Sequence, residues 1–179
     1  MVAVDVHTSF HAKKKKKKLG RASNGRKYHI TLLPVVCADA SLHENTRECM
    51  KPTLILPDMK MPAFDHSNLP GFFWMGTQSG WVNSAVWRKW AKRFLVFVWA
   101  HRERHNIAPS TPIILWCDNL KCRLDKKVED MLRGGGNIIV LTFPPNTTHL
   151  FRPLDSDIFL EFKKELRKEF TRLHGSMHP

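Results

Sequence analysis

Two aspartates follow segments that would deliver them to one place. Asp118 comes directly after the apolar segment 113–117, and Asp155 follows the turn-forming segment 143–153. A carboxylate at the end of a buried strand is costly to hold unless a hydrogen-bond donor or a cation compensates its charge. Hard divalent cations such as Mg2+ take carboxylate oxygens as ligands. The pattern therefore predicts a metal site that contains both acids.

The rest of the chain must supply the elements that position these acids. Apolar runs predict five strands, and apolar residues at three- and four-residue steps predict three helices. Strands are expected at 1–6, 30–38, 53–56, 113–117 and 138–143, and helices at 85–105, 125–133 and 154–173. The short turns between the first three strands favour an antiparallel meander. The later alternation of strands and helices favours parallel strands added to the same sheet. The prediction is an α/β fold with one mixed five-stranded sheet, in the order βββ-α-β-α-β-α, flanked by helices.

The strongest helix signal lies at 85–105, where basic residues fill the face opposite the apolar stripe. Asn83 or Ser84 can cap this helix at its start. Large aromatic residues at helical spacing belong to a core more often than to a base-stacking surface. We therefore expect three tryptophans of this region in the core: Trp87, Trp90 and Trp99.

Two segments lack any regular period. Prolines and glycines interrupt residues 57–80, which predicts an irregular loop, and residues 11–28 are basic and turn-rich, which predicts a mobile loop. The second segment contains candidate nucleic-acid contacts, namely Lys13, Lys14, Lys15, Lys16, Lys17, Lys18 and Arg21. Such a run also serves as a nuclear import signal in some proteins, and in others it is a solvated loop.

The composition favours a folded domain that binds a polyanion. The 179 residues have a formal net charge of +13, from 29 Lys and Arg against 16 Asp and Glu, with 42% hydrophobic residues. Such an excess of positive charge attracts nucleic acid. The apolar run 94–100 is too short to span a bilayer, so we expect no membrane partner. The spacing of the four cysteines favours reduced thiols over a zinc site.

Four motifs, in order along the chain, resemble those of the DDE endonuclease domain of pogo and jerky-like transposases. Any one of them could be a plain turn or strand end, whereas four in sequence are specific. The resemblance covers nearly the whole chain and implies a ribonuclease-H-like fold, with residues 1–179 as a single DDE domain. The motifs are Ser79-Gly80-Trp81-Val82-Asn83-Ser84, Asp118-Asn119, Phe143-Pro144-Pro145-Asn146-Thr147-Thr148-His149 and Pro153-Leu154-Asp155.

The resemblance implies an activity and the residues that perform it. The activity is cleavage of transposon ends, dependent on Mg2+ or Mn2+, followed by joining of the 3′-hydroxyl to target DNA. Carried over by position, Asp5, Asp118 and Asp155 are the catalytic metal ligands, and Asp157 is an alternative to Asp155. In a two-metal site the cations activate the attacking oxygen and stabilise the leaving oxygen.

Three residues depart from the family pattern and leave other functions open. Val6 follows the first acid where a second acid is common, Arg123 stands where histidine is usual, and Asp157 replaces glycine. The second hypothesis is therefore a catalytically inactive or domesticated nucleic-acid-binding remnant of a transposase. A third is a nuclease of the same fold that acts on RNA, because fold alone does not specify the substrate.

The resemblance also implies partners and a location. The partners are transposon ends and target DNA, and the location is the nucleus. The helix-turn-helix modules that usually recognise transposon ends are not in this sequence, so we expect a separate targeting domain or a homodimer. Because Asp5 lies so near residue 1, we also expect an upstream segment to be missing from the sequence.

Overall fold

The structure is a computed structural model of the 179-residue chain. The predicted basic loop at 11–28 lies outside the residues that it describes, and so does the part of the predicted 57–80 loop between 58 and 70. The described residues are 2–3, 29–37, 50–57, 71–118, 125–144, 160–165, 168 and 172.

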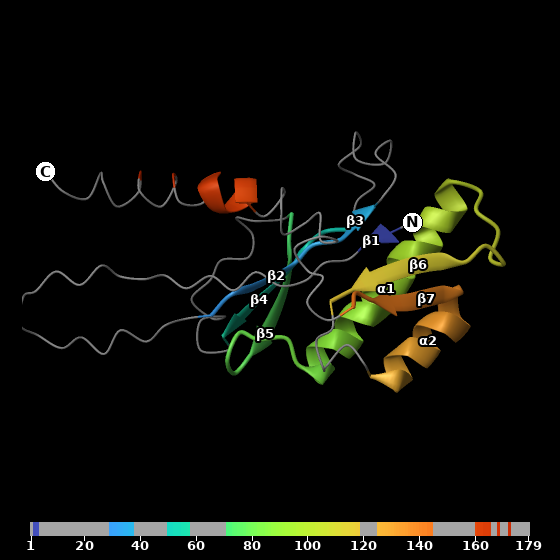
Figure 1. The fold of residues 1–179 in the computed structure, drawn as a ribbon, viewed down its shortest axis with the longest axis horizontal. Helices are drawn as coiled ribbons and strands as arrows, with labels where there is room; N and C mark the ends of the chain where they lie inside the picture. Colours follow the sequence, from blue (N-terminus) through green and yellow to red (C-terminus); the bar gives the residue numbers. More distant parts are fainter. Residues whose placement is uncertain are drawn as a thin grey trace, which may run out of the picture.

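The described strands form two mixed sheets (Figure 1). One sheet has the order β3-β1-β6-β7, with β1 antiparallel to β3 and parallel to β6, and β6 parallel to β7. The other has the order β2-β4-β5, with β4 antiparallel to β2 and parallel to β5. The predicted α/β class with mixed pairing is confirmed. The strands are β1 (Val2–Ala3), β2 (Thr31–Leu33), β3 (Val36–Cys37), β4 (Thr53–Pro57), β5 (Phe73–Thr77), β6 (Ile113–Cys117) and β7 (Ile138–Thr142).

The strand arrangement differs from the single five-stranded sheet that we expected, in two places. Residues 30–38, expected as one strand, are divided at Pro34 into β2 and β3, which belong to different sheets. Proline has no N–H to donate to a ladder, which makes it a natural point of division. The second difference is β5, which occupies part of the expected 57–80 loop and pairs with β4 from Thr53 with Phe73 to Pro57 with Thr77.

Helix α1 (Ser84–Arg104) confirms the strongest helix prediction, and Asn83 caps it by accepting a hydrogen bond from the Val86 N–H at 2.9 Å. Helix α2 (Lys126–Gly136) begins as expected but continues through the glycines that were expected to end it. A Cβ on Gly136 would lie 2.5 Å from the Leu95 side chain, so glycine here permits close packing against α1. Asn137 ends α2 instead, with a left-handed φ of 49°.

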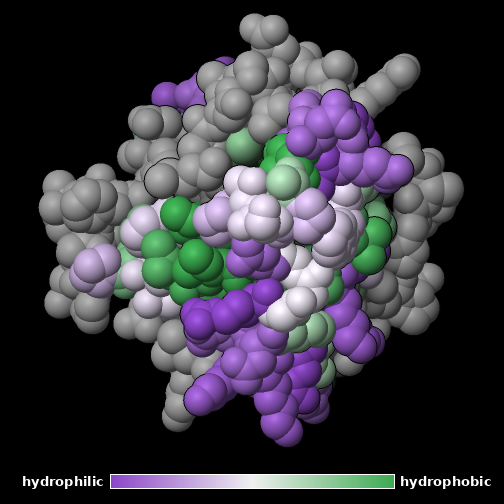
Figure 2. Space-filling model, turned by 90° about the vertical axis from the view of Figure 1, so that its right-hand side faces the viewer, coloured by the Kyte–Doolittle hydropathy of each residue, from purple (hydrophilic) through white to green (hydrophobic). Residues whose placement is uncertain are grey.

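The end of the molecule where α1 and α2 finish is closed by the segment that follows α1. Figure 2 looks onto this end and shows a pale centre, with hydrophilic residues, in purple, below it and at the upper right, and hydrophobic residues, in green, on the left. Arg102 is only 2% exposed, and its guanidinium donates to the carbonyl oxygens of Ala108, Thr111 and Gly136 at 2.6–3.0 Å. Nearby, the Asn137 side chain donates to the Ser110 carbonyl oxygen at 2.8 Å. These bonds hold both helix ends to one loop.

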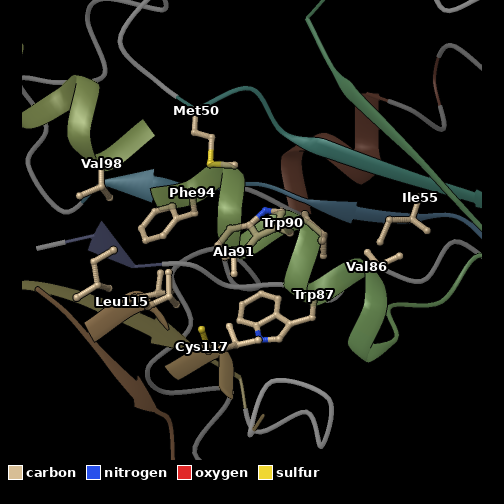
Figure 3. Close-up of a cluster of buried hydrophobic side chains, with 14 residues drawn as sticks. Met50, Ile55, Val86, Trp87, Trp90, Ala91, Phe94, Val98, Leu115 and Cys117 are labelled. Atoms are coloured by element: carbon tan, nitrogen blue, oxygen red, sulfur yellow. The ribbon is translucent and has the colours of Figure 1, made fainter. Parts of the chain in front are cut away.

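The core lies between α1 and the two sheets (Figure 3). Trp87 stacks on Trp90 with ring centroids 4.7 Å apart, and Trp90 stacks on Phe94 at 5.2 Å. All three are fully buried and share a cluster with Ile55 of β4 and Leu115 of β6. The predicted core role is therefore confirmed for Trp87 and Trp90. Trp99 is instead 44% exposed, because it stands beside the buried stripe of α1 and not on it, and its indole N–H donates to the Gly135 carbonyl oxygen of α2 at 2.7 Å.

The C-terminal helix predicted at 154–173 is helical at the described positions 160–165, 168 and 172. Its exposed face carries ion pairs three residues apart, Glu161 with Lys164 and Glu165 with Lys168. In the described part of the chain, no helix combines the length and the apolar character that crossing a membrane requires.

Candidate active site at the carboxyl edge of the sheet

Asp118 follows β6 directly, as the sequence predicts, and is only 2% exposed. The backbone that carries it is held by the sheet, because the Phe143 N–H donates to the Cys117 carbonyl oxygen at 3.1 Å. The Trp116 ring also stacks on Phe143, with centroids 5.2 Å apart. The backbone that leads into Asp118 is therefore held by both β6 and the residue that follows β7.

The carboxyl ends of two parallel strands meet beside Asp118. Strands β6 and β7 run in the same direction, and Cys117 is paired with Thr142 at their ends. Helices α1 and α2 both begin at this side of the sheet (Figure 1). In open α/β sheets, ligands bind outside the carboxyl ends of the strands, where helix N-termini offer a positive partial charge. This carboxyl edge is the candidate active site.

Strand β1 pairs with β6 on the side opposite β7 and ends at the same edge of the sheet. It runs parallel to β6 and pairs Val2 with Leu115 and Ala3 with Trp116. Because parallel strands end at the same edge, β1 directs the chain towards the place where Asp118 lies.

The Ser79-Gly80-Trp81 motif anchors the start of α1. Gly80 has a φ of 76°, and a Cβ there would lie 2.0 Å from the carbonyl oxygen of His29, so only glycine is tolerated. The Thr31 hydroxyl donates to the Gly80 carbonyl oxygen at 2.8 Å, and the His29 ring stacks on Trp81 at 3.6 Å. The motif joins the entry of α1 to β2 and to the residue His29 that precedes it.

A family model described as DDE superfamily endonuclease matches residues 30–175, which is more than half of the chain. The chain belongs to the DDE superfamily endonucleases. The resemblance inferred from the four motifs is thus confirmed for the family, and the pogo and jerky-like subfamily is compatible with it. No curated protein and no solved structure gives a significant match. The family implies DNA as the substrate, and its members generally depend on a divalent metal.

Asp118 is the predicted ligand of this DDE domain that the structure describes. Asp5 and Asp155 lie outside the described residues, and so do the basic candidates from Lys13 to Lys18 and Arg21. Among the described residues, no group of three or more His, Cys, Asp or Glu side chains surrounds a possible metal position. Asp118 has the chemistry and the place of a ligand for Mg2+ or Mn2+, and the roles of the other acids stay predictions.

One interaction near the edge has no signal in the sequence. The Arg88 guanidinium of α1 donates to the carboxylate of Asp125, the N-cap of α2, at 2.9 Å. The hydrogen bond from Arg88, with its positive charge, holds the pKa of Asp125 below its usual value. The two residues are 37 positions apart, so only the tertiary packing brings them together. This pair joins the starts of the two helices beside the candidate site.

Proposed function

We propose that this chain is the catalytic domain of a transposon-derived DDE endonuclease, which cleaves DNA strands and transfers the 3′ ends to target DNA. The observation that carries the proposal is Asp118, a buried carboxylate at the carboxyl edge of a sheet within the matched DDE family region. Asp118 holds a divalent cation in this proposal, together with Asp5 and Asp155. The chemistry that Mg2+ or Mn2+ supplies when bound is activation of a water or 3′-hydroxyl and stabilisation of the leaving oxygen.

The pairing of β1 with β6 supports the inclusion of Asp5. Val2 pairs with Leu115 and Ala3 with Trp116, so each partner lies 113 positions further along the chain. Asp5 and Asp118 are separated by the same 113 positions. A register that continued for two more residues would bring the two carboxylates side by side, where a shared cation would offset their repulsion.

Two observations support the inclusion of Asp155. It lies within the residues that match the DDE family, and the chain that leads to it departs from β7 at the carboxyl edge, at Phe143 and Pro144. Asp157 stays the alternative, because both acids fall in the first turn of the helix predicted at 154–173.

The remaining parts of the proposal concern partners and location. The basic residues Lys13 to Lys18 and Arg21 contact DNA phosphates without regard to base sequence, which the net charge of +13 favours. The domain acts in the nucleus, and a separate targeting domain or a homodimer supplies recognition of transposon ends.

Cleavage of a supercoiled plasmid tests the function. The chain should nick the plasmid with Mn2+ or Mg2+ and not with a chelator, and Asp118→Asn should reduce nicking at least 100-fold, as removal of a charge-stabilising group does. Asp130→Asn is the matched control, because Asp130 is an exposed acid of α2. Nicking that survives Asp118→Asn would contradict the proposed site.

The second candidate is a DNA-binding remnant that has lost catalysis. The departures at Val6, Arg123 and Asp157 favour it, together with the positive charge of the chain. The same assay discriminates the two functions. Salt-sensitive binding of the plasmid, without nicking at any metal concentration, would support the remnant and overturn the endonuclease.

A further inference from the structure

An exposed group of basic side chains lies on the first half of α1 and at the start of α2, and we call it the helical basic surface. Helix α1 carries no acid in its first turn, and its first acidic residue is Glu103 near its end. The members of the group are all exposed: Arg88, Lys89 and Lys92 of α1 with Lys126 and Lys127 of α2.

The contacts between α1 and α2 place this surface on the side of the sheet where Asp118 follows β6. Arg88 meets Asp125 where both helices begin, and Trp99 donates to the Gly135 carbonyl oxygen near their other ends. The two helices are therefore parallel, and the five basic residues share one end of the helix pair. That end is the carboxyl edge, where β6 finishes and Asp118 follows (Figure 1).

Arg88 is paired with Asp125, but the fold does not account for the charges of the four lysines. A helix start has a positive partial charge, which Asp125 and Glu129 offset at the start of α2, whereas Lys126 and Lys127, the first two residues of that helix, oppose it. Arg88 and Lys92 are like charges at a spacing of four, which is also unfavourable. In the part of the chain that the structure describes, no ion pair engages Lys89, Lys92 or Lys126. Such an arrangement is expected where a partner supplies the negative charge.

We propose that the helical basic surface binds phosphates of the DNA strand that lies across the carboxyl edge. The proposal rests on the proposed function for the choice of DNA as the polyanion. Lys89 and Lys92 lie within one turn of α1, so their flexible side chains can reach phosphates on the same stretch of backbone. These contacts position the strand next to Asp118, and they read no base sequence.

Equilibrium binding of a duplex oligonucleotide at several salt concentrations tests the surface without any need for catalysis. The full chain with Asp118→Asn is used in chelator, so cleavage cannot interfere. Adding Lys89→Gln with Lys92→Gln should reduce the magnitude of the slope of log K against log salt by about 1.8, since each phosphate contact contributes about 0.9. Lys89→Arg with Lys92→Arg should restore most of the slope, which excludes misfolding as the cause.

The control removes the same charge elsewhere. Lys164→Gln with Lys168→Gln neutralises two exposed lysines of the C-terminal helix, each paired with a glutamate, and should leave the slope unchanged. Equal slopes for the chain with Lys89→Gln and Lys92→Gln and for its Asp118→Asn parent would overturn the surface, whatever the nicking assay shows. If the Lys89 and Lys92 substitutions reduce the salt slope but the chain never nicks DNA, the surface is upheld and only the endonuclease function is refuted.

Discussion

The two ends of the helix pair use positive charge in opposite ways. Where α1 and α2 finish, Arg102 is buried and donates to three carbonyl oxygens, and Arg104 lies at a helix end that favours cations. Where they begin, Lys126 and Lys127 face solvent at the first two positions of α2, which favour anions, and Lys89 and Lys92 of α1 are exposed as well. The first end is arranged for stability. The second end gives up some stability, which is expected of a functional site.

The largest expected effect is at the end arranged for stability. Arg102→Met keeps the apolar length of the side chain but leaves three carbonyl oxygens without their charged donor, so we expect a loss of about 3 kcal/mol in the free energy of unfolding. Urea denaturation measures it. Arg104→Met, two residues on and exposed, should lose under about 1 kcal/mol. Equal losses would show that the closed end does not depend on the buried guanidinium.

A smaller effect has opposite signs at the two ends. Lys126→Glu places an acid at the first residue of α2 and should raise the free energy of unfolding by about 0.5 kcal/mol. Arg104→Glu places an acid at the last residue of α1 and should lower it by a similar amount. Both are read from thermal melts at low salt. The comparison between the ends fails if Lys126→Glu destabilises the domain as Arg104→Glu does.

The smallest effect concerns the Arg88 and Asp125 pair, which is partly exposed. The folded pKa of Asp125 is lowered, chiefly by the hydrogen bond from Arg88. Its contribution to stability is therefore complete above the unfolded pKa of about 4 and is lost as the pH falls through the folded value. Asparagine also caps helices, so Asp125→Asn removes the charge alone. The melting temperatures of the unsubstituted protein and of Asp125→Asn should differ at pH 6 and converge below pH 4. A difference that stays constant with pH would show that Asp125 is not the group whose titration changes the stability.

Local patterns predicted the segments nearest to the candidate site. Strand β6 runs from Ile113 to Cys117 and ends before Asp118 because a continuous apolar run meets an acid there. Asn83 was one of two candidates for the cap of α1, and the structure selects it. In each case, the signal depends on neighbours a few residues apart, which the sequence contains in full.

Other features depend on residues that are far apart in the chain. The glycines after Arg133 indicated a helix end, but Leu95 of α1 needs the small size of Gly135 and Gly136 to pack. Strand β5 exists where prolines and glycines suggested a loop, because Phe73 to Thr77 pair with β4. Pairing and packing of this kind override local preference when the partner supplies hydrogen bonds and buried area.

The sequence by itself determined the α/β class, the amphipathic helices, the excess of positive charge and the motifs that mark a DDE endonuclease. Each of these follows from composition or from the spacing of nearby residues. Only the tertiary structure decided that β2 and β3 join different sheets, that α1 and α2 run parallel, and that their basic residues lie on the side where Asp118 is buried. Those relations arise from contacts between distant segments, and no local pattern in the chain encodes them.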